Sequence, residues 1–203
     1  MGKIFYIMGK SGTGKDTIKK LLMEITKNKY ENFEEIIPCT TRPKRYEEVE
    51  DVDYHFVTEE HMREDESYKD ILEMRSYNTV KGVWYYYTRK SDIDLANYNY
   101  IAIGTIESFK TLKLALGEDN IIPIYIYASQ KQRLLWMIKR EELNTVPCYK
   151  EICRRYMQDE EDFTDEKLKK AGIDENHMFY NEEGYALFLA DTLFHSIIEE
   201  TLH

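Results

Sequence analysis

Residues 9–17 are the stretch of this sequence whose composition and spacing are best suited to chemistry. In order, they are Gly9, Lys10, Ser11, Gly12, Thr13, Gly14, Lys15, Asp16 and Thr17. The spacing Gly-x-x-x-x-Gly-Lys is typical of a P-loop, whose backbone N–H groups turn inward onto phosphate oxygens because the glycines carry no Cβ. The closing lysine reaches the outer phosphates. We therefore expect residues 9–17 to bind a nucleoside triphosphate.

The residue that follows the P-loop lysine affects how Mg²⁺ can be bound. This position ordinarily holds a serine or threonine whose hydroxyl meets Mg²⁺, but here it holds Asp16, with Thr17 next. A carboxylate is a good Mg²⁺ ligand, so Asp16 and Thr17 are our candidate metal ligands. The alternative is that Asp16 only complements the positive end of the following helix, while phosphates and water hold the ion.

A P-loop indicates nucleotide phosphates but leaves the reaction open. A GTPase would need a guanine-reading Asn-Lys-x-Asp element, and the sequence contains none. It contains instead an Arg-Pro-x-Arg loop at 42–45, a tyrosine at position 54, an acid at Glu73 and a Tyr-Tyr-x-Thr at 85–88. These residues restrict the kinds of nucleotide-binding protein that the sequence can represent.

In these segments the chain resembles the guanylate kinase family. The family's acceptor loop reads Ser-x-Thr-Thr-Arg-x-Pro-Arg-x-Gly-Glu and is followed by Asp-Tyr-x-Phe-Val. Matching residues stand at 40–45, at Glu48 and at 53–57, with the same spacing. Glu73 matches the family's Phe-Ile-Glu, and 85–88 match its Tyr-Tyr-Gly-Ser/Thr. The resemblance extends over essentially the whole chain.

The resemblance implies an ATP-dependent nucleoside monophosphate kinase that transfers the γ-phosphate to GMP or dGMP in the presence of Mg²⁺. The acceptor phosphate would be bound by Arg42, Arg45, Tyr54 and Tyr86. These residue types suit the task, because an arginine fork binds two phosphate oxygens at once and a phenol donates one further hydrogen bond.

The resemblance also implies roles at the two bases and at the reacting phosphate. Glu73 would accept guanine N1–H and the 2-amino group, Thr88 would serve guanine O6, and Asn181 would lie near adenine. The catalytic cations would be Lys15, Arg42, Arg45, Arg140 and Arg155, the last two from a lid that closes over the phosphates.

Some positions depart from the family pattern. The guanine-contacting serine falls at Pro38, the glycine of Tyr-Tyr-Gly-Thr at Tyr87, and two strand acids at Ile103 and Thr105. We expect these departures to alter the base pocket and the metal site. A kinase for another nucleotide or small phosphorylated acceptor is therefore a second hypothesis. A third is a noncatalytic protein-interaction module of guanylate kinase type, which the intact P-loop disfavours.

Hydrophobic periodicity predicts the elements that position these residues. Strands are expected at 4–8, 33–38, 53–57, 100–103, 121–127 and 178–180, with an antiparallel pair within 71–88. Helices are expected after the P-loop, after Thr58, at 106–116, after Ser129 and at 186–197. In the helix after Ser129, we expect Leu134, Leu135 and Ile138 to form the apolar face. Ser91 is expected to cap a further short helix.

Alternating strands and helices predict an α/β fold. We expect a P-loop parallel β-sheet core with flanking helices, a small acceptor-binding insertion with antiparallel strands, and a helical lid. As one domain over 1–203, the chain would divide into a core (1–36, 91–138 and 177–203), an NMP-binding region (37–90) and a lid (139–176). A Glu- and Lys-rich insertion at 163–176 would lengthen the lid.

Composition limits the partners. A formal charge of −10 argues against nucleic acid and anionic membranes, so ATP and GMP are the expected partners. Three cysteines imply no disulfide framework, and no apolar run approaches the length of a membrane span. With no apolar leader ahead of the first strand, a cytoplasmic location is expected.

Overall fold

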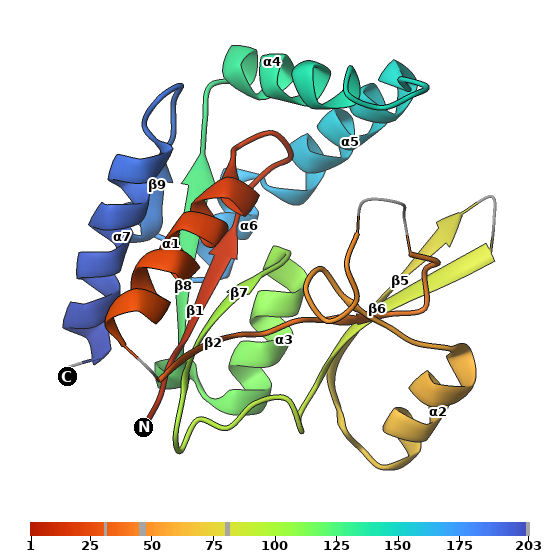
Figure 1. Ribbon diagram of the computed structural model, residues 1–203, viewed down its shortest axis with the longest axis vertical. Coiled ribbons are helices and arrows are strands. Elements are labelled where there is room, and N and C mark those ends of the chain that lie inside the picture. Colours follow the sequence, from red (N-terminus) through yellow and green to blue (C-terminus); the bar gives the residue numbers. More distant parts are fainter. Residues whose placement is uncertain (31, 45–47, 80–81, 202–203) are drawn as a thin grey trace.

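The computed structural model of the chain describes all residues except 31, 45–47, 80–81 and 202–203. Two β-sheets organise the described part of the chain, and Figure 1 shows them side by side with helices around the larger one. The α/β fold predicted from the sequence is confirmed. No helix among the described residues has the length and apolar character needed to cross a membrane.

The larger sheet carries the P-loop. It contains β2 (Phe33–Glu35), β7 (Asn99–Ile103), β1 (Ile4–Met8), β8 (Ile121–Tyr127) and β9 (Met178–Tyr180), in that spatial order and all parallel. The central strand β1 is buried along its whole length, as both faces of a parallel sheet usually are. The P-loop therefore leaves the middle of the sheet at the carboxyl ends of the strands, where ligands bind in open α/β sheets.

Helices cover both faces of this sheet. Helices α1 (Lys15–Lys29) and α7 (Ala186–Thr201) pack with Phe5 and Ile7 on one face. Helices α3 (Ile106–Leu116) and α6 (Asp165–Lys170) pack with Tyr6 and Met8 on the other. The alternation of side chains along β1 thus divides the core into two clusters. Two short 3₁₀ helices, η1 (Glu118–Asn120) and η2 (Glu175–His177), precede β8 and β9.

The smaller sheet lies between β2 and β7 in the chain. Its strands are β4 (His55–Phe56), β3 (Cys39–Thr40), β6 (Gly82–Arg89) and β5 (Ile71–Thr79), in that spatial order. Strands β5 and β6 form the expected antiparallel pair. Helix α2 (Glu59–Ser67) packs on one face, where Cys39, Met62 and Tyr87 form a separate buried cluster. Thr58 caps α2 as predicted, accepting the His61 N–H.

Helices α4 (Gln130–Glu141) and α5 (Tyr149–Asp162) form the upper edge of the molecule in Figure 1. The apolar set predicted for α4 does not form its buried face, because Leu134, Leu135 and Ile138 are 36–42% exposed. Arg133 and Met137 are buried instead. A charged residue has thus taken a position where the sequence predicts aliphatic packing.

The expected helix capped by Ser91 is wrong. Residues 91–97 form turns and no helix; Ser91 binds both carboxylate oxygens of Asp70 through its N–H and hydroxyl, which ties the loop to the start of β5. Residues 163–173, which were expected to lengthen the lid, also contribute to the core. Phe163, Leu168 and Ile173 are buried in the core cluster beneath α3, so this segment is part of the core packing.

Candidate active site

The P-loop connects the carboxyl end of β1 to the first turn of α1. Gly12 and Gly14 have φ angles of 76° and 79°, in the left-handed region that glycine adopts without strain. A Cβ on Gly14 would come within 2.5 Å of the Asn181 amide nitrogen, and one on Gly12 within 2.6 Å of the Arg133 carbonyl oxygen. Both the backbone angle and the close approach therefore require glycine at these two positions.

Asn181 braces the P-loop from the end of β9. It is 2% exposed, and its amide nitrogen donates to the Thr13 carbonyl at 2.8 Å. Thr13 is also buried and turns back on the loop, its hydroxyl donating to the Lys10 carbonyl at 2.9 Å. The side-chain oxygen of Asn181 has no hydrogen-bond partner among the described residues. A buried acceptor without a partner is costly, so this oxygen is suited to receive a ligand N–H.

Positive charge gathers around Lys15. Burial lowers the pKa of the Lys15 ammonium, the Asp16 and Asp159 carboxylates raise it, and the Arg155 and Arg140 guanidiniums lower it further. Burial, and after it Arg140, also lowers the pKa of Arg155. The structure thus brings the predicted lid arginines to the P-loop lysine. Such a group of cations at a helix N-terminus is an anion site.

Helix α5 is held against the P-loop by several polar contacts. Arg155 donates to the Ser11 hydroxyl at 3.1 Å, and the Ser11 N–H donates to Asp159 at 2.6 Å. Lys10 pairs with Glu160 at 2.7 Å. Two P-loop residues are therefore tied to the helix that supplies the lid arginine.

Arg133 on α4 completes this network, although the sequence gives no indication of its role. Its side chain is 3% exposed and donates to the Ser11 carbonyl at 3.0 Å and to Glu160 at 2.6 Å; Asp159 lies 3.4 Å away. Its guanidinium also lies 4.7 Å from the centre of the Tyr156 ring. Its partners lie in the P-loop and on α5, far from position 133 in the sequence. No local sequence pattern therefore indicates them.

We expect Arg133→Met to lower the free energy of unfolding by about 3 kcal/mol, because it removes the guanidinium that joins Asp159, Glu160 and the Ser11 carbonyl and leaves Glu160 with Lys10 as its remaining cation. Urea denaturation followed by circular dichroism measures this. Arg154→Met is the matched control: Arg154 is 62% exposed and pairs with Glu151, so its loss should cost less than about 1 kcal/mol. Equal losses in the two variants would show that the network adds no stability.

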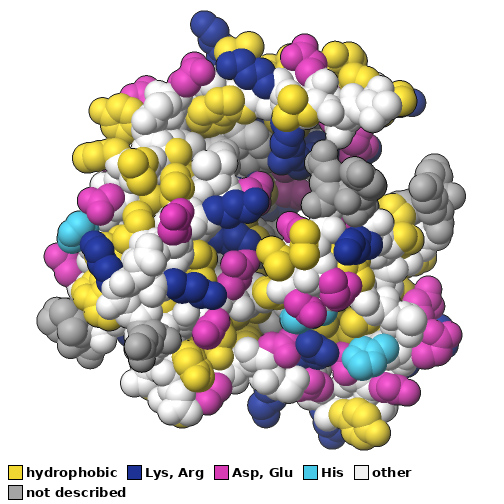
Figure 2. All heavy atoms as spheres, viewed as in Figure 1, with side chains coloured by type: hydrophobic (Ala, Val, Ile, Leu, Met, Phe, Trp, Pro, Cys, Tyr) yellow, Lys and Arg dark blue, Asp and Glu magenta, His cyan; other side chains and the backbone are white. Residues whose placement is uncertain are grey.

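A second polar surface lies on one face of the β5–β6 pair. We call it the acceptor wall and define it as Glu73, Arg75, Tyr77, Tyr86 and Thr88. The register places Glu73 opposite Thr88 and Arg75 opposite Tyr86, and side chains two residues apart share a face. Figure 2 shows a hollow in the middle of the molecule, between the regions of α1, α5 and β6 in Figure 1, with Lys and Arg side chains on its walls.

Arg42 anchors one end of the acceptor wall. It is 3% exposed, its Nε donates to the Tyr86 hydroxyl at 3.0 Å, and its two terminal nitrogens donate to Glu48 at 2.9 and 2.6 Å. A further N–H binds the Pro43 carbonyl. Because Tyr86 accepts from Arg42, the Tyr86 proton is left to point at a ligand. Arg45, predicted beside them, lies outside the described residues.

Tyr54 lies next to this anchor. Its ring is edge-on to Tyr86 at 5.6 Å between centres, and the Arg42 guanidinium lies 5.4 Å from its centre. Burial raises the pKa of the Tyr54 phenol, so the hydroxyl is a hydrogen-bond donor at neutral pH. The structure thus brings Arg42, Tyr54 and Tyr86 together, and they present hydroxyl donors suited to an anion.

Glu73 and Thr88 lie at the other end of the wall. Both are buried, and the Thr88 hydroxyl donates to Glu73 at 3.1 Å. Burial raises the pKa of Glu73, while the Arg75 guanidinium and the Thr88 hydrogen bond lower it. Arg75 was not identified from the sequence. Its Nε lies 3.2 Å from a Glu73 oxygen.

Comparisons with known proteins identify the family of the chain. A family model described as guanylate kinase matches residues 1–177. The chain belongs to the guanylate kinase family. A guanylate kinase of Mesomycoplasma hyopneumoniae (strain 7448) is 32% identical over 136 residues, 66% of this chain and 62% of that protein. One of Thermotoga maritima is 28% identical over 148 residues, 73% of this chain and 56% of that protein.

The chain therefore spans about three-fifths of the length of these curated guanylate kinases. Among solved structures, the guanylate kinase of Anaplasma phagocytophilum superposes with a TM-score of 0.65 at 17% identity, covering 100% of this chain and 87% of that one. At that identity the superposition supports the fold alone. It agrees with the two-sheet architecture described above.

One departure from the guanylate kinase pattern does not reach the base site. Tyr87 was expected to alter the base pocket, but its side chain points to the opposite face of β6, because neighbours along a strand alternate. It is fully buried there, and its hydroxyl donates to Asp65 of α2 at 2.6 Å. Burial raises the pKa of Tyr87 well above its usual range.

The other departures do remove donors or acids from guanylate kinase positions. Thr105 caps α3, accepting the Ser108 N–H, and Ile103 packs against the core cluster of α1 and α7. Pro38 offers only its carbonyl, which accepts the His55 N–H at 3.0 Å. The serine and strand acids of the family have thus been replaced by groups used in the fold itself.

The predicted metal ligands lie at the start of α1. Asp16 and Thr17 are both exposed on its first turn, and the Asp16 charge reaches Lys15 and Arg155. A carboxylate and a hydroxyl beside a phosphate site fit the oxygen ligands that Mg²⁺ takes.

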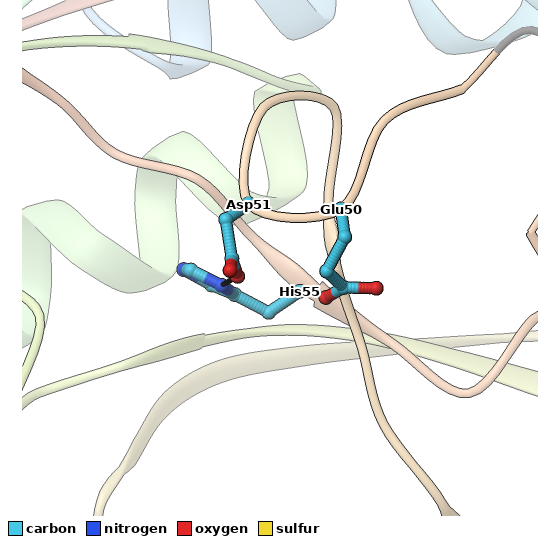
Figure 3. Close-up of side chains that lie close together, drawn as sticks. All are labelled: Glu50, Asp51 and His55. Atoms are coloured by element: carbon cyan, nitrogen blue, oxygen red, sulfur yellow. Dashed lines mark hydrogen bonds and ion pairs between the residues drawn. The ribbon is translucent and has the colours of Figure 1, made fainter.

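A different group of possible ligands, Glu50, Asp51 and His55, is shown in Figure 3. His55 Nδ1 lies 2.6 Å from Asp51, and Glu50 accepts the Phe56 N–H at 2.9 Å. These contacts hold the connection between β3 and β4 in place. We therefore assign the three side chains a structural role in that loop.

Proposed function

We propose that this protein is a guanylate kinase that transfers the γ-phosphoryl group of ATP to GMP or dGMP, giving ADP and GDP. The observation that carries the proposal is the presence of two complementary sites in one guanylate kinase fold. One is a P-loop surrounded by lid cations, and the other is the acceptor wall with its Arg42–Tyr86 anchor. Phosphoryl transfer needs mainly alignment and neutralisation of charge, and these sites supply both.

On the donor side, residues 9–17 bind the triphosphate of ATP through the loop N–H groups and Lys15. Arg140 and Arg155 stabilise the charge that develops on the transferred group, supported by their closeness to Lys15. The unpartnered oxygen of Asn181 accepts the adenine 6-amino group.

On the acceptor side, Arg42, Arg45, Tyr54 and Tyr86 bind the phosphate of GMP. The described members of this set support the assignment, because their hydroxyl and guanidinium groups converge. Glu73 accepts the guanine N1–H and 2-amino group. The division into a core, an NMP-binding region at 37–90 and a lid at 139–176 is part of the proposal, with residues 163–173 also serving the core.

Mg²⁺ belongs to the proposal as the ion that neutralises phosphate charge when bound. Asp16 would hold it directly or through water, with Thr17 as a second oxygen ligand. This assignment rests on the exposed position of both side chains beside Lys15.

We expect Asp16→Ala to raise the Mg²⁺ concentration needed for half-maximal ATP binding by about tenfold or more, because a carboxylate ligand is lost. Asp16→Ser should recover part of this, since it restores a hydroxyl. Calorimetric titration of ATP at a series of Mg²⁺ concentrations measures the effect. Glu24→Ala, which removes an exposed acid from the same helix, is the control. If the Mg²⁺ dependence is unchanged in both Asp16 variants, Asp16 does not bind the metal and only complements the positive end of α1.

A coupled ADP-release assay with ATP and Mg²⁺ tests the function against a panel of GMP, dGMP, IMP, AMP, UMP and CMP. Selective turnover of GMP and dGMP supports the proposal. Because Pro38 replaces the family's guanine-contacting serine, a kinase for another phosphorylated acceptor is the second candidate. Selective turnover of a different acceptor would support it. No turnover with any acceptor would indicate a noncatalytic binding module.

The proposal includes a cytoplasmic location. All three cysteines are free, and Cys148 and Cys153 are exposed, which suits a reducing compartment. ATP and GMP are the proposed partners.

A further inference from the structure

Arg75 occupies an unusual place on the acceptor wall. It lies two residues beyond Glu73 on β5, on the same face, and its side chain is 17% exposed. Its Nη2 donates to one Glu73 oxygen at 3.3 Å, and its Nε lies 3.2 Å from the other. The proposed guanine-reading carboxylate therefore has a guanidinium beside it.

The contact between the two side chains is close but poorly aligned. Glu73 Oε2 and Arg75 Nε are both buried, and neither has a hydrogen-bond partner among the described residues. A buried carboxylate oxygen and a buried N–H normally find hydrogen-bond partners, so a base that displaced their contact with each other would supply the hydrogen bond that each atom lacks. The wall thus offers an acceptor and a donor side by side.

The neighbouring hydroxyl cannot supply this donor. A threonine has a single O–H proton, and the Thr88 proton is directed to Glu73 at 3.1 Å. Pro38 has no side-chain donor, and Tyr87 is on the opposite face of the strand, bound to Asp65. Among the described residues of the wall near Glu73, the remaining donor for a base carbonyl is therefore the Arg75 guanidinium.

We propose that Arg75 is a specificity-determining residue that donates to O6 of the guanine ring while Glu73 accepts N1–H and the 2-amino group. The inference rests on the proposed GMP kinase function and names the contact that selects the base. Guanine O6 and N7 are both acceptors and form a common target of arginine. Adenine presents a 6-amino donor to Arg75 and an N1 acceptor to Glu73, so both contacts become unfavourable.

The surroundings of Arg75 are consistent with a charged, fixed donor. Glu73, Tyr6 of β1 and Tyr77 all raise the pKa of Arg75, although burial opposes them. Tyr6 is itself held, its hydroxyl 2.6 Å from that of Ser108 on α3. Burial raises the pKa of Tyr6 to about 12, so the phenol is neutral and offers Arg75 no competing anion.

The test pairs a change in the protein with a change in the base. 6-Thio-GMP keeps N1–H and the 2-amino group but replaces O6 with sulfur, which is a weaker acceptor. For the wild type we expect kcat/KM to be about 10-fold or more higher for GMP than for 6-thio-GMP. In Arg75→Ala this ratio should fall to near one, and in Arg75→Lys, which keeps a donor, it should be intermediate.

Arg89→Ala is the matched control. Arg89 is an ion-paired arginine at the end of β6, bound to Asp92 at 2.9 Å. Its loss should leave the GMP/6-thio-GMP ratio unchanged. Thermal unfolding of each variant shows whether it folds, and if Arg75→Ala does not, the ratio in Arg75→Lys and Arg75→Gln decides.

A pH profile supplies an independent readout. Arg75 is the cation facing Glu73 from β5; the Thr88 hydroxyl faces it from β6, and the neutral Tyr6 phenol lies on β1. Removing Arg75 removes a group that lowers the pKa of Glu73, so Glu73 will stay protonated to higher pH. The acidic limb of kcat/KM for GMP should therefore move to higher pH in Arg75→Ala.

The outcomes separate this inference from the proposed function. No turnover of GMP by the wild type would overturn the proposed function itself. Turnover of GMP with the same GMP/6-thio-GMP ratio in the wild type and in Arg75→Ala would leave the function standing and overturn the role of Arg75. If the acidic limb of the pH profile moves in Arg75→Ala but the GMP/6-thio-GMP ratio does not change, Arg75 only positions Glu73. That result would also overturn the O6 contact.

Discussion

Lys15→Met is expected to lower kcat by about a thousandfold while the protein remains folded. Methionine has nearly the length of lysine but carries no charge, so it removes the cation that reaches the transferred phosphoryl group. Because burial already lowers the pKa of Lys15, the folded protein holds this charge at a cost. Its removal should therefore not destabilise the fold. Steady-state kinetics with ATP and GMP, together with thermal unfolding, measure both effects.

Lys20→Met is the matched control for this prediction. Lys20 lies on the same helix, is exposed, and should tolerate the change with kcat within about twofold of the wild type. A Lys15→Met enzyme that kept more than a tenth of its activity would show that Arg140 and Arg155 carry the charge stabilisation by themselves. A loss of folding would instead assign Lys15 to the architecture of the P-loop.

The sequence allows the central sheet and its P-loop to be predicted because the signals are local. A five-residue apolar strand, a glycine spacing and a helical stripe lie within about thirty positions of each other. The β5–β6 pair is equally local, as its two strands follow each other closely in the sequence. Where the signals are weaker, the expectation at Ser91 was wrong, because that hydroxyl binds Asp70 across the chain instead of capping a helix.

Arg133 shows a limit that no local pattern overcomes. Its partners are the Ser11 carbonyl and two acids of α5, separated from it by 122, 26 and 27 residues. In the sequence it follows three polar residues and comes directly before the apolar run 134–138, and the aliphatic residues of that run favour an aliphatic face. The desolvation of the guanidinium is offset by contacts that exist only once α5 has docked on the P-loop.

Strand alternation explains both a correction and an omission at the acceptor wall. Counting in steps of two from Glu73 places Arg75 and Tyr77 on its face, and counting from Tyr86 places Tyr87 on the other. Alternation alone therefore could have removed Tyr87 from the base site and added Arg75. It could not have shown that the Thr88 proton is directed to Glu73, which depends on the β5–β6 register.

We expect Arg42→Lys to raise the KM for GMP by about a hundredfold or more while the KM for ATP stays within about twofold. Four of the five N–H groups of Arg42 are bound, to Tyr86, the Pro43 carbonyl and both oxygens of Glu48. A lysine carries three donors on one nitrogen and cannot reach these positions together. Tyr86 would lose the partner that turns its proton toward the acceptor phosphate.

Tyr86→Phe separates the hydroxyl from the arginine. It removes one hydrogen bond to the phosphate and leaves the ion pair between Arg42 and Glu48 in place, so the KM for GMP should rise by only about tenfold. If Arg42→Lys and Tyr86→Phe have equal effects, Arg42 acts through Tyr86 alone. If Arg42→Lys raises the KM for ATP as much as that for GMP, Arg42 belongs to neither site separately, and the acceptor wall has been wrongly assigned. Initial rates over a grid of ATP and GMP concentrations distinguish these results, because they determine the two KM values independently.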